Sequence, residues 1–112
     1  MFSDEQRLNL AKAKWRYSGA DFSVSDPLFK LIAKRTNDPM RRFGFLISGK
    51  VGKAAVRNRS KRYLTECVRD HLEEFPEKFD YIFIAHPEIA KKTHEEICSS
   101  VDKILPKVSL LR

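Results

Sequence analysis

One stretch dominates this sequence: Lys50-Val51-Gly52-Lys53-Ala54-Ala55-Val56-Arg57-Asn58-Arg59-Ser60-Lys61-Arg62. Its first four residues form a basic, glycine-containing connection, and the remainder begins a long helix that we predict over residues 54–74. Successive residues of a helix are rotated by about 100°, which places the apolar side chains on one face: Val56, Tyr63, Leu64, Cys67, Val68, Leu72 and Phe75. The first two turns therefore carry charge on nearly every side except a narrow line that faces the core.

A helix that starts in this way is unfavourable in isolation. Arg57 and Lys61 are like charges four residues apart, which repel one another. Cations at a helix N-terminus also oppose the helix dipole. A phosphate group resolves both problems, because it accepts hydrogen bonds from the first backbone N–H groups and from guanidinium groups. We therefore predict an anion-binding surface at this helix start, against the alternative of a solvated basic face.

The positive charge of the chain is concentrated in the same segment. The formal net charge is +7. Residues 41–62 contain eight lysines and arginines and no acid, whereas the rest of the chain carries 14 cations and 15 acids. A concentrated basic block beside a neutral remainder is typical of a surface that binds a polyanion.

The flanking segments predict an α+β fold in a single domain over residues 1–112. Upstream, we predict a helix from Ser3 to Ser18, an edge strand at residues 20–24, and strands at 28–34 and 42–48 that pair as a hairpin. Downstream, the continuous apolar run at residues 81–85 predicts a central strand covered on both faces. A capping box of Thr93 and Glu96 begins the last helix, which we expect to end at Pro106. The architecture is a sandwich of helices on a small mixed sheet.

The basic segment resembles the signature of the bacterial ribonuclease P protein family. In that family a strand ends in a Ser-x-Lys-x-Gly loop and leads into a helix bearing Arg-Asn-Arg-x-Lys-Arg. The matching residues here are Arg42-Phe43-Gly44-Phe45, Ser48, Lys50-Val51-Gly52, Ala54, Val56 and Arg57-Asn58-Arg59-Ser60-Lys61-Arg62. The resemblance covers about residues 28–111, and the sequence departs from the family pattern at Ala11, Gly49 and Thr65.

The resemblance implies an α-β-β-β-α-β-α sandwich with a left-handed crossover between parallel strands. It also implies a function, as the protein subunit of ribonuclease P, which binds the catalytic RNA and positions the 5′ leader of precursor tRNA for cleavage. The residues expected to bind RNA are Arg42, Lys50, Lys53, Arg57, Asn58, Arg59, Lys61 and Arg62. The protein itself is expected to bind no cofactor, Mg²⁺ to arrive through the RNA partner, and no protein partner or membrane to be required.

The family resemblance also implies a cleft for the single-stranded leader, between the first helix and the sheet. Single strands bind through aromatic stacking and backbone cations. The aromatic candidates are Trp15, Tyr17, Phe22, Phe29, Phe43 and Phe45, near Lys30, Lys34 and Arg42. Trp15, Phe22, Phe29 and Phe45 are the preferred four, with burial in the core as the alternative for each.

No catalytic or metal-binding residues are expected in the protein. His71, His86 and His94 occur singly, without the spacing of metal ligands or of a nucleophile and its base. Cys67 and Cys98 form no C-x-x-C pair, and we expect both to be small buried thiols in a reducing cytosol. A cytoplasmic location is expected, because the first five residues include acids and no apolar run that would indicate a signal peptide.

Three other functions compete with this one. A ribosome-associated RNA-binding protein would share the basic surface but have no leader cleft. A metal-dependent nuclease acting alone would need acids near the basic surface, and residues 40–65 contain none. A DNA-binding module would place its charge along one exposed stripe of the helix rather than around the first turns.

Overall fold

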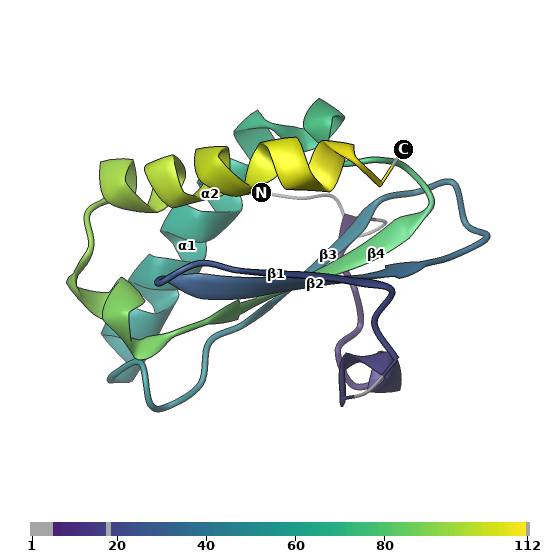
Figure 1. Cartoon of the computed structure of the whole chain (residues 1–112). Helices are drawn as coiled ribbons and strands as arrows, with labels where there is room; N and C mark the ends of the chain where they lie inside the picture. The colour runs from purple at the N-terminus through teal and green to yellow at the C-terminus, as the bar shows by residue number, and fades with distance from the viewer. Residues whose placement is uncertain (1–5, 18, 112) are drawn as a thin grey trace.

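The computed structural model describes residues 6–17 and 19–111, and of Lys14 and Tyr17 only the backbone. Two α-helices lie on one face of a four-stranded sheet, and the N-terminal segment lies on the other face (Figure 1). With η for 3₁₀ helices, the elements are η2 (Lys14–Tyr17), β1 (Phe22–Ser25), β2 (Phe29–Arg35), β3 (Arg42–Leu46), α1 (Ala54–Asp70), η3 (Leu72–Glu74), β4 (Phe79–Ala85), η4 (Pro87–Lys91) and α2 (His94–Ser109). The α+β prediction is confirmed. None of the described helices is both long and apolar enough to span a membrane.

The sheet has the strand order β1-β2-β4-β3. β1 with β2 and β2 with β4 are antiparallel, whereas β3 runs parallel to β4. The predicted hairpin of residues 28–34 with 42–48 is therefore wrong, because β4 lies between these two strands. β4 is the most apolar strand, and the central position buries both of its faces, as predicted.

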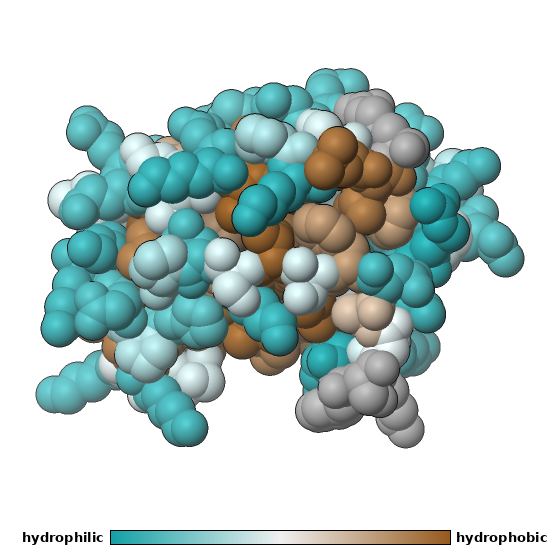
Figure 2. Space-filling view, in the orientation of Figure 1, coloured by the Kyte–Doolittle hydropathy of each residue, from teal (hydrophilic) through white to brown (hydrophobic). Residues whose placement is uncertain are grey.

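The main core lies between the sheet and the two helices. Phe29, Leu31, Tyr81 and Phe83 point to this side and are fully buried. Phe43 stacks on Tyr81 with ring centroids 5.1 Å apart, and Phe45 stacks on Phe83 at 5.5 Å. Figure 2 shows apolar side chains between the helical layer and the sheet, with hydrophilic side chains around them.

Helix α2 begins as predicted and extends further than predicted. The Thr93 hydroxyl accepts a hydrogen bond from the Glu96 N–H, and the Glu96 carboxylate accepts one from the Thr93 N–H, so the capping box is confirmed. Pro106 does not end the helix, which continues to Ser109. The last turn persists because Leu105 and Val108 are buried in the core on either side of the proline.

The first predicted helix is largely absent. Residues 1–5 and 18 lie outside the described part, and residues 7–13 are turns and extended backbone, followed by the short helix η2. The Leu8 N–H donates to the Phe43 carbonyl at 2.9 Å, and Arg7 forms a parallel bridge with Phe43. This segment is therefore an extension of the sheet at β3, and its side chains Leu8, Leu10 and Trp15 pack on the open sheet face.

The two cysteines are joined. Cys67 in α1 and Cys98 in α2 form a disulfide with Cα atoms 5.1 Å apart, so the expectation of two separate thiols is wrong. The expectation that His94 is isolated is wrong as well, because its Nε2 lies 3.8 Å from both sulfur atoms. The packing of α1 on α2 brings together residues that 31 positions separate in the sequence.

Candidate RNA-binding surfaces

The start of α1 is an uncapped, positively charged helix end. The N-cap residue is Lys53, whose side chain makes no capping hydrogen bond, and the first turn contains no acid. Seven of the eight predicted RNA-binding residues lie in the preceding loop or within the first nine residues of the helix: Lys50, Lys53, Arg57, Asn58, Arg59, Lys61 and Arg62. All except the half-buried Arg57 are exposed. The structure therefore gathers the cations beside backbone N–H groups that an anion can use.

Neighbouring groups orient two of these guanidinium side chains, and a third has an unpartnered nitrogen. Arg59 donates from Nη2 to the Ala90 carbonyl at 3.0 Å. The Arg62 guanidinium lies 5.2 Å from the centre of the Tyr63 ring. Arg57 has a buried Nε without a hydrogen-bond partner among the described residues. A bound phosphate would give the Arg57 group a charged partner.

The turn into α1 requires a glycine. Gly52 has φ +152°, a conformation that side chains rarely adopt, and an added Cβ would lie 3.2 Å from Cγ1 of Val56. Gly49, one of the departures from the family pattern, has open space around it. The backbone conformation of Gly52 thus determines how the loop that carries Lys50 and Lys53 enters the helix.

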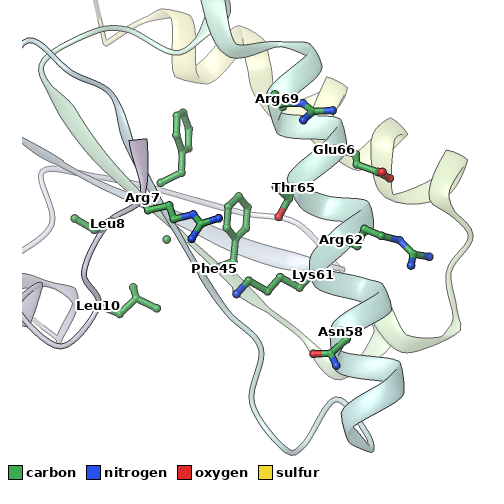
Figure 3. Close-up of a pocket in the computed structure, with 12 residues that line it drawn as sticks. Arg7, Leu8, Leu10, Phe45, Asn58, Lys61, Arg62, Thr65, Glu66 and Arg69 are labelled. Atoms are coloured by element: carbon green, nitrogen blue, oxygen red, sulfur yellow. The ribbon is translucent and has the colours of Figure 1, made fainter. Parts of the chain in front are cut away.

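A groove runs beside the start of α1. Figure 3 shows α1 on one side of this groove and the N-terminal segment and β3 on the other, with Lys61 extending from the helix toward the strand that carries Phe45. Its volume is about 460 Å³, and its walls are Arg7, Leu8, Leu10, Phe43, Gly44 and Phe45 on one side and Asn58, Lys61, Arg62, Thr65, Glu66 and Arg69 on the other. The helical residues follow the three-and-four spacing of a single helix face.

The groove contains residues that the sequence did not single out. Arg7, Leu8 and Leu10 form its far wall because their segment joins the sheet instead of forming a helix. No local sequence signal indicates this pairing. Thr65 and Glu66 could have been found, since they occupy the same helix face as Lys61 and Arg62.

Arg42 is separate from the other predicted RNA-binding residues. It lies at the start of β3, where it contacts the Asp38 carboxylate and lies 4.0 Å from Asp80. Hydrogen bonds from the Met40 N–H and from Arg42 lower the pKa of Asp38. Burial raises the pKa of Asp80, and the nearby Arg42 only partly offsets this. Arg42 therefore neutralises two carboxylates at this end of the sheet.

The open face of the sheet is a second basic and apolar surface. Lys30 and Lys34 point away from the helices, because strand residues alternate between faces and Phe29 and Leu31 are in the core. Lys30 is paired across the strands with Ile84, and Ile84 and Trp15 both pack against the buried cluster of Ala13, Ile32 and Ile82. Lys34 lies 3.7 Å from Asp21, whose pKa is lowered chiefly by a hydrogen bond from the Arg35 N–H.

The four preferred leader-cleft aromatics do not share one surface. Phe29 is fully buried in the core, so its assignment to a cleft is wrong, and Phe43 is buried as well. Phe45 lines the groove beside α1, Phe22 lies on the outer strand β1, and Trp15 packs on the open sheet face. The side chain of Tyr17 lies outside the described part. Of the four, Trp15 is therefore the candidate in the apolar cluster of the open sheet face, which also contains Ile84.

Comparisons with known proteins agree with the sequence resemblance. A family model described as Ribonuclease P matches residues 8–109. The "Ribonuclease P protein component" of Clostridium novyi is 33% identical over 92 residues, which are 82% of this chain and 81% of that protein. The protein of the same name from Geobacillus kaustophilus is 38% identical over 73 residues, which are 65% of this chain and 60% of that protein.

Solved structures show the same fold. The ribonuclease P protein of Staphylococcus aureus superposes with a TM-score of 0.82 at 24% identity, over 96% of this chain and 98% of that one. The ribonuclease P protein of Thermotoga maritima superposes with a TM-score of 0.79 at 21% identity, over 90% of this chain and 96% of that one. Sequence and fold agree along nearly the whole chain. This chain therefore belongs to the ribonuclease P protein component family.

Proposed function

We propose that this chain is the protein subunit of ribonuclease P, which binds the catalytic RNA through the start of α1 and holds the 5′ leader of precursor tRNA on the open sheet face. The observation that carries the proposal is the uncapped start of α1, where exposed cations surround free helix N–H groups. That combination suits the phosphates of a structured polyanion better than it suits water.

The first contact in this proposal is between α1 and RNA phosphates. Lys50 and Lys53 in the loop and Lys61 and Arg62 on the helix are exposed on either side of the helix start. Phosphate contacts of this kind release counterions, so binding weakens steeply as salt rises. They also position one RNA without reading its sequence, which suits a partner recognised by its folded shape.

The second contact is between the open sheet face and the leader. Trp15 is partly exposed in the apolar cluster of this face, to which Ile84 also belongs, and Lys30 is the cross-strand partner of Ile84. Aromatic rings and cations on one face are the combination that binds single-stranded nucleic acid without strong sequence preference. The leader would therefore pass over the sheet on the side away from α1 and α2.

In this proposal the protein contributes binding and positioning, and hydrolysis takes place in the RNA. Mg²⁺ is expected to be held by RNA phosphates. The basic surface would lower the repulsion between the catalytic RNA and the precursor, which reduces the Mg²⁺ concentration needed for cleavage.

The test is reconstitution with the cognate ribonuclease P RNA at low Mg²⁺, followed by cleavage assays on precursor tRNA. We expect cleavage to depend on the protein. Trp15→Ala should weaken precursor binding at least about fivefold, since one stacked base contributes about 1–3 kcal/mol. Binding of leaderless tRNA should not change.

Lys103→Ala is the matched control for a second variant, Lys30→Ala. Both remove one cation, but Lys103 is exposed on α2, away from the open sheet face. Lys30→Ala should weaken precursor binding and Lys103→Ala should not. Protein-independent cleavage, or equal effects of the two variants, would contradict the proposal.

A further inference from the structure

A cluster of metal-ligand side chains joins the two helices, next to Glu66, which also lines the groove. Cys67 comes from α1, and His94 and Cys98 come from the first turns of α2. The Nε2 atom of His94 is 3.8 Å from the sulfur of Cys67 and 3.8 Å from the sulfur of Cys98. Their ligand atoms all lie within 4.8 Å of one another. The family function proposed above uses none of these residues.

The geometry resembles that of a tetrahedral zinc site. Zinc binds thiolate sulfur at about 2.3 Å and imidazole nitrogen at about 2.0–2.1 Å, which separates sulfur from nitrogen by about 3.6 Å in a tetrahedron. Both sulfur–nitrogen distances here are 3.8 Å. Only the two sulfur atoms, now bonded to each other, must move apart, and rotation about the cysteine side chains can supply that movement.

The surroundings of His94 also suit a metal ligand. Its ring contacts the Tyr63 ring edge-on at 5.1 Å between centroids, which limits its rotation. The Glu66 carboxylate lies 3.4 Å from Nε2 of His94 and is partly exposed. Cys67 is buried, whereas His94 and Cys98 are half-buried. A bound ion would therefore have protein on one side and an open position toward solvent and Glu66 on the other.

We propose that the reduced protein binds one Zn²⁺ ion through Cys67, His94 and Cys98, with water or Glu66 in the fourth position. Reduction of the disulfide by a dithiol or phosphine adds two electrons and two protons and yields two thiols. Zinc binding then releases those two protons, and the two thiolates neutralise the charge of the ion. The disulfide and the zinc site use the same sulfur atoms, so each excludes the other.

The bound ion would cross-link α1 and α2 in a reducing compartment, where a disulfide does not persist. A metal bridge and a disulfide both restrain the same pair of helices. The inference depends only on the chain itself and not on RNA binding. Its failure would leave the proposed function unaffected.

The test uses the full chain, reduced with a phosphine under anaerobic conditions and titrated with Co²⁺ alone and then Zn²⁺ alone. We expect the visible bands of tetrahedral cobalt and a near-ultraviolet thiolate-to-cobalt band, both lost when about one equivalent of Zn²⁺ displaces the cobalt. His94→Ala should weaken zinc binding by more than about 100-fold, beyond the loss typical of an outer-shell residue.

His71→Ala is the matched control, because His71 also joins α1 to α2, through Asp102 at 2.9 Å, but lies outside the cluster. It should bind zinc as the wild type does. Zinc should also slow alkylation of both cysteines in the reduced wild-type chain, a measurement that needs no variant. Absence of the cobalt bands, absence of this protection, or equal zinc affinity of the His94 and His71 variants would overturn the proposal.

Discussion

Removal of two cations from the start of α1 should change how RNA binding depends on salt. The variant Lys61→Ala/Arg62→Ala deletes two adjacent exposed charges, one of which extends over the groove (Figure 3). Each phosphate contact contributes about 0.7–0.9 to the slope of log affinity against log salt. Loss of two contacts should therefore lower this slope by about 1.4–1.8.

That change in slope has a measurable consequence. Between 50 and 200 mM salt, the ratio of the variant's Kd to the wild-type Kd should therefore fall by about 7–12-fold. Filter binding or fluorescence anisotropy with the catalytic RNA measures both slopes. Lys103→Ala/Lys107→Ala is the matched control, since it removes two exposed charges from α2 and lowers the net charge equally. Parallel slopes for wild type and the α1 variant, or equal changes in both variants, would refute phosphate binding at the start of α1.

Three further changes test the fold around these surfaces. Gly52→Ala places a Cβ atom at φ +152° and 3.2 Å from Val56, so it should lower the free energy of unfolding by about 1–3 kcal/mol. Urea unfolding measures this change, and an unchanged midpoint would show that the turn accommodates the side chain without strain. Tyr81→Phe removes the buried hydrogen bond from the Tyr81 hydroxyl to the Pro76 carbonyl at 2.6 Å, so it should lower the free energy of unfolding by about 1–2 kcal/mol. RNA affinity should not change, and a loss of affinity would refute a purely structural role for this hydroxyl. Burial raises the pKa of Asp80, so its contribution to stability is full below the usual value of 3.8 and is lost as pH rises through the higher folded-state pKa. Asp80→Asn should therefore raise the melting temperature at pH 7 and have little effect near pH 3, and equal effects at both pH values would contradict this cause.

Local signals in the sequence predicted several elements correctly. The Thr93 and Glu96 pair specified the start of α2, because both of its hydrogen bonds close within one turn. The apolar run of β4 specified a central strand, because only a strand covered on both faces buries every side chain. The cations at the start of α1 were found because consecutive helical residues stay together in any fold.

Long-range pairing could not be predicted in the same way. The turn residues between β2 and β3 suggested a hairpin, but β4, which follows α1 in the chain, enters between the two strands. Residues 3–18 are compatible with a helix by sequence, but the hydrogen bond from the Leu8 N–H to the Phe43 carbonyl ties this segment to the sheet. Cys67 and Cys98 meet only because α1 packs on α2.

We propose that the crowded positive start of α1 binds one structured RNA in preference to others. The most direct measurement compares the affinity of the protein for ribonuclease P RNA with its affinity for a ribosomal RNA fragment of equal length, at the same moderate salt. We predict clearly tighter binding to ribonuclease P RNA, and a loss of that preference in Lys61→Ala/Arg62→Ala. Equal affinity of the unaltered protein for both RNAs would contradict the account and indicate a general RNA-binding surface.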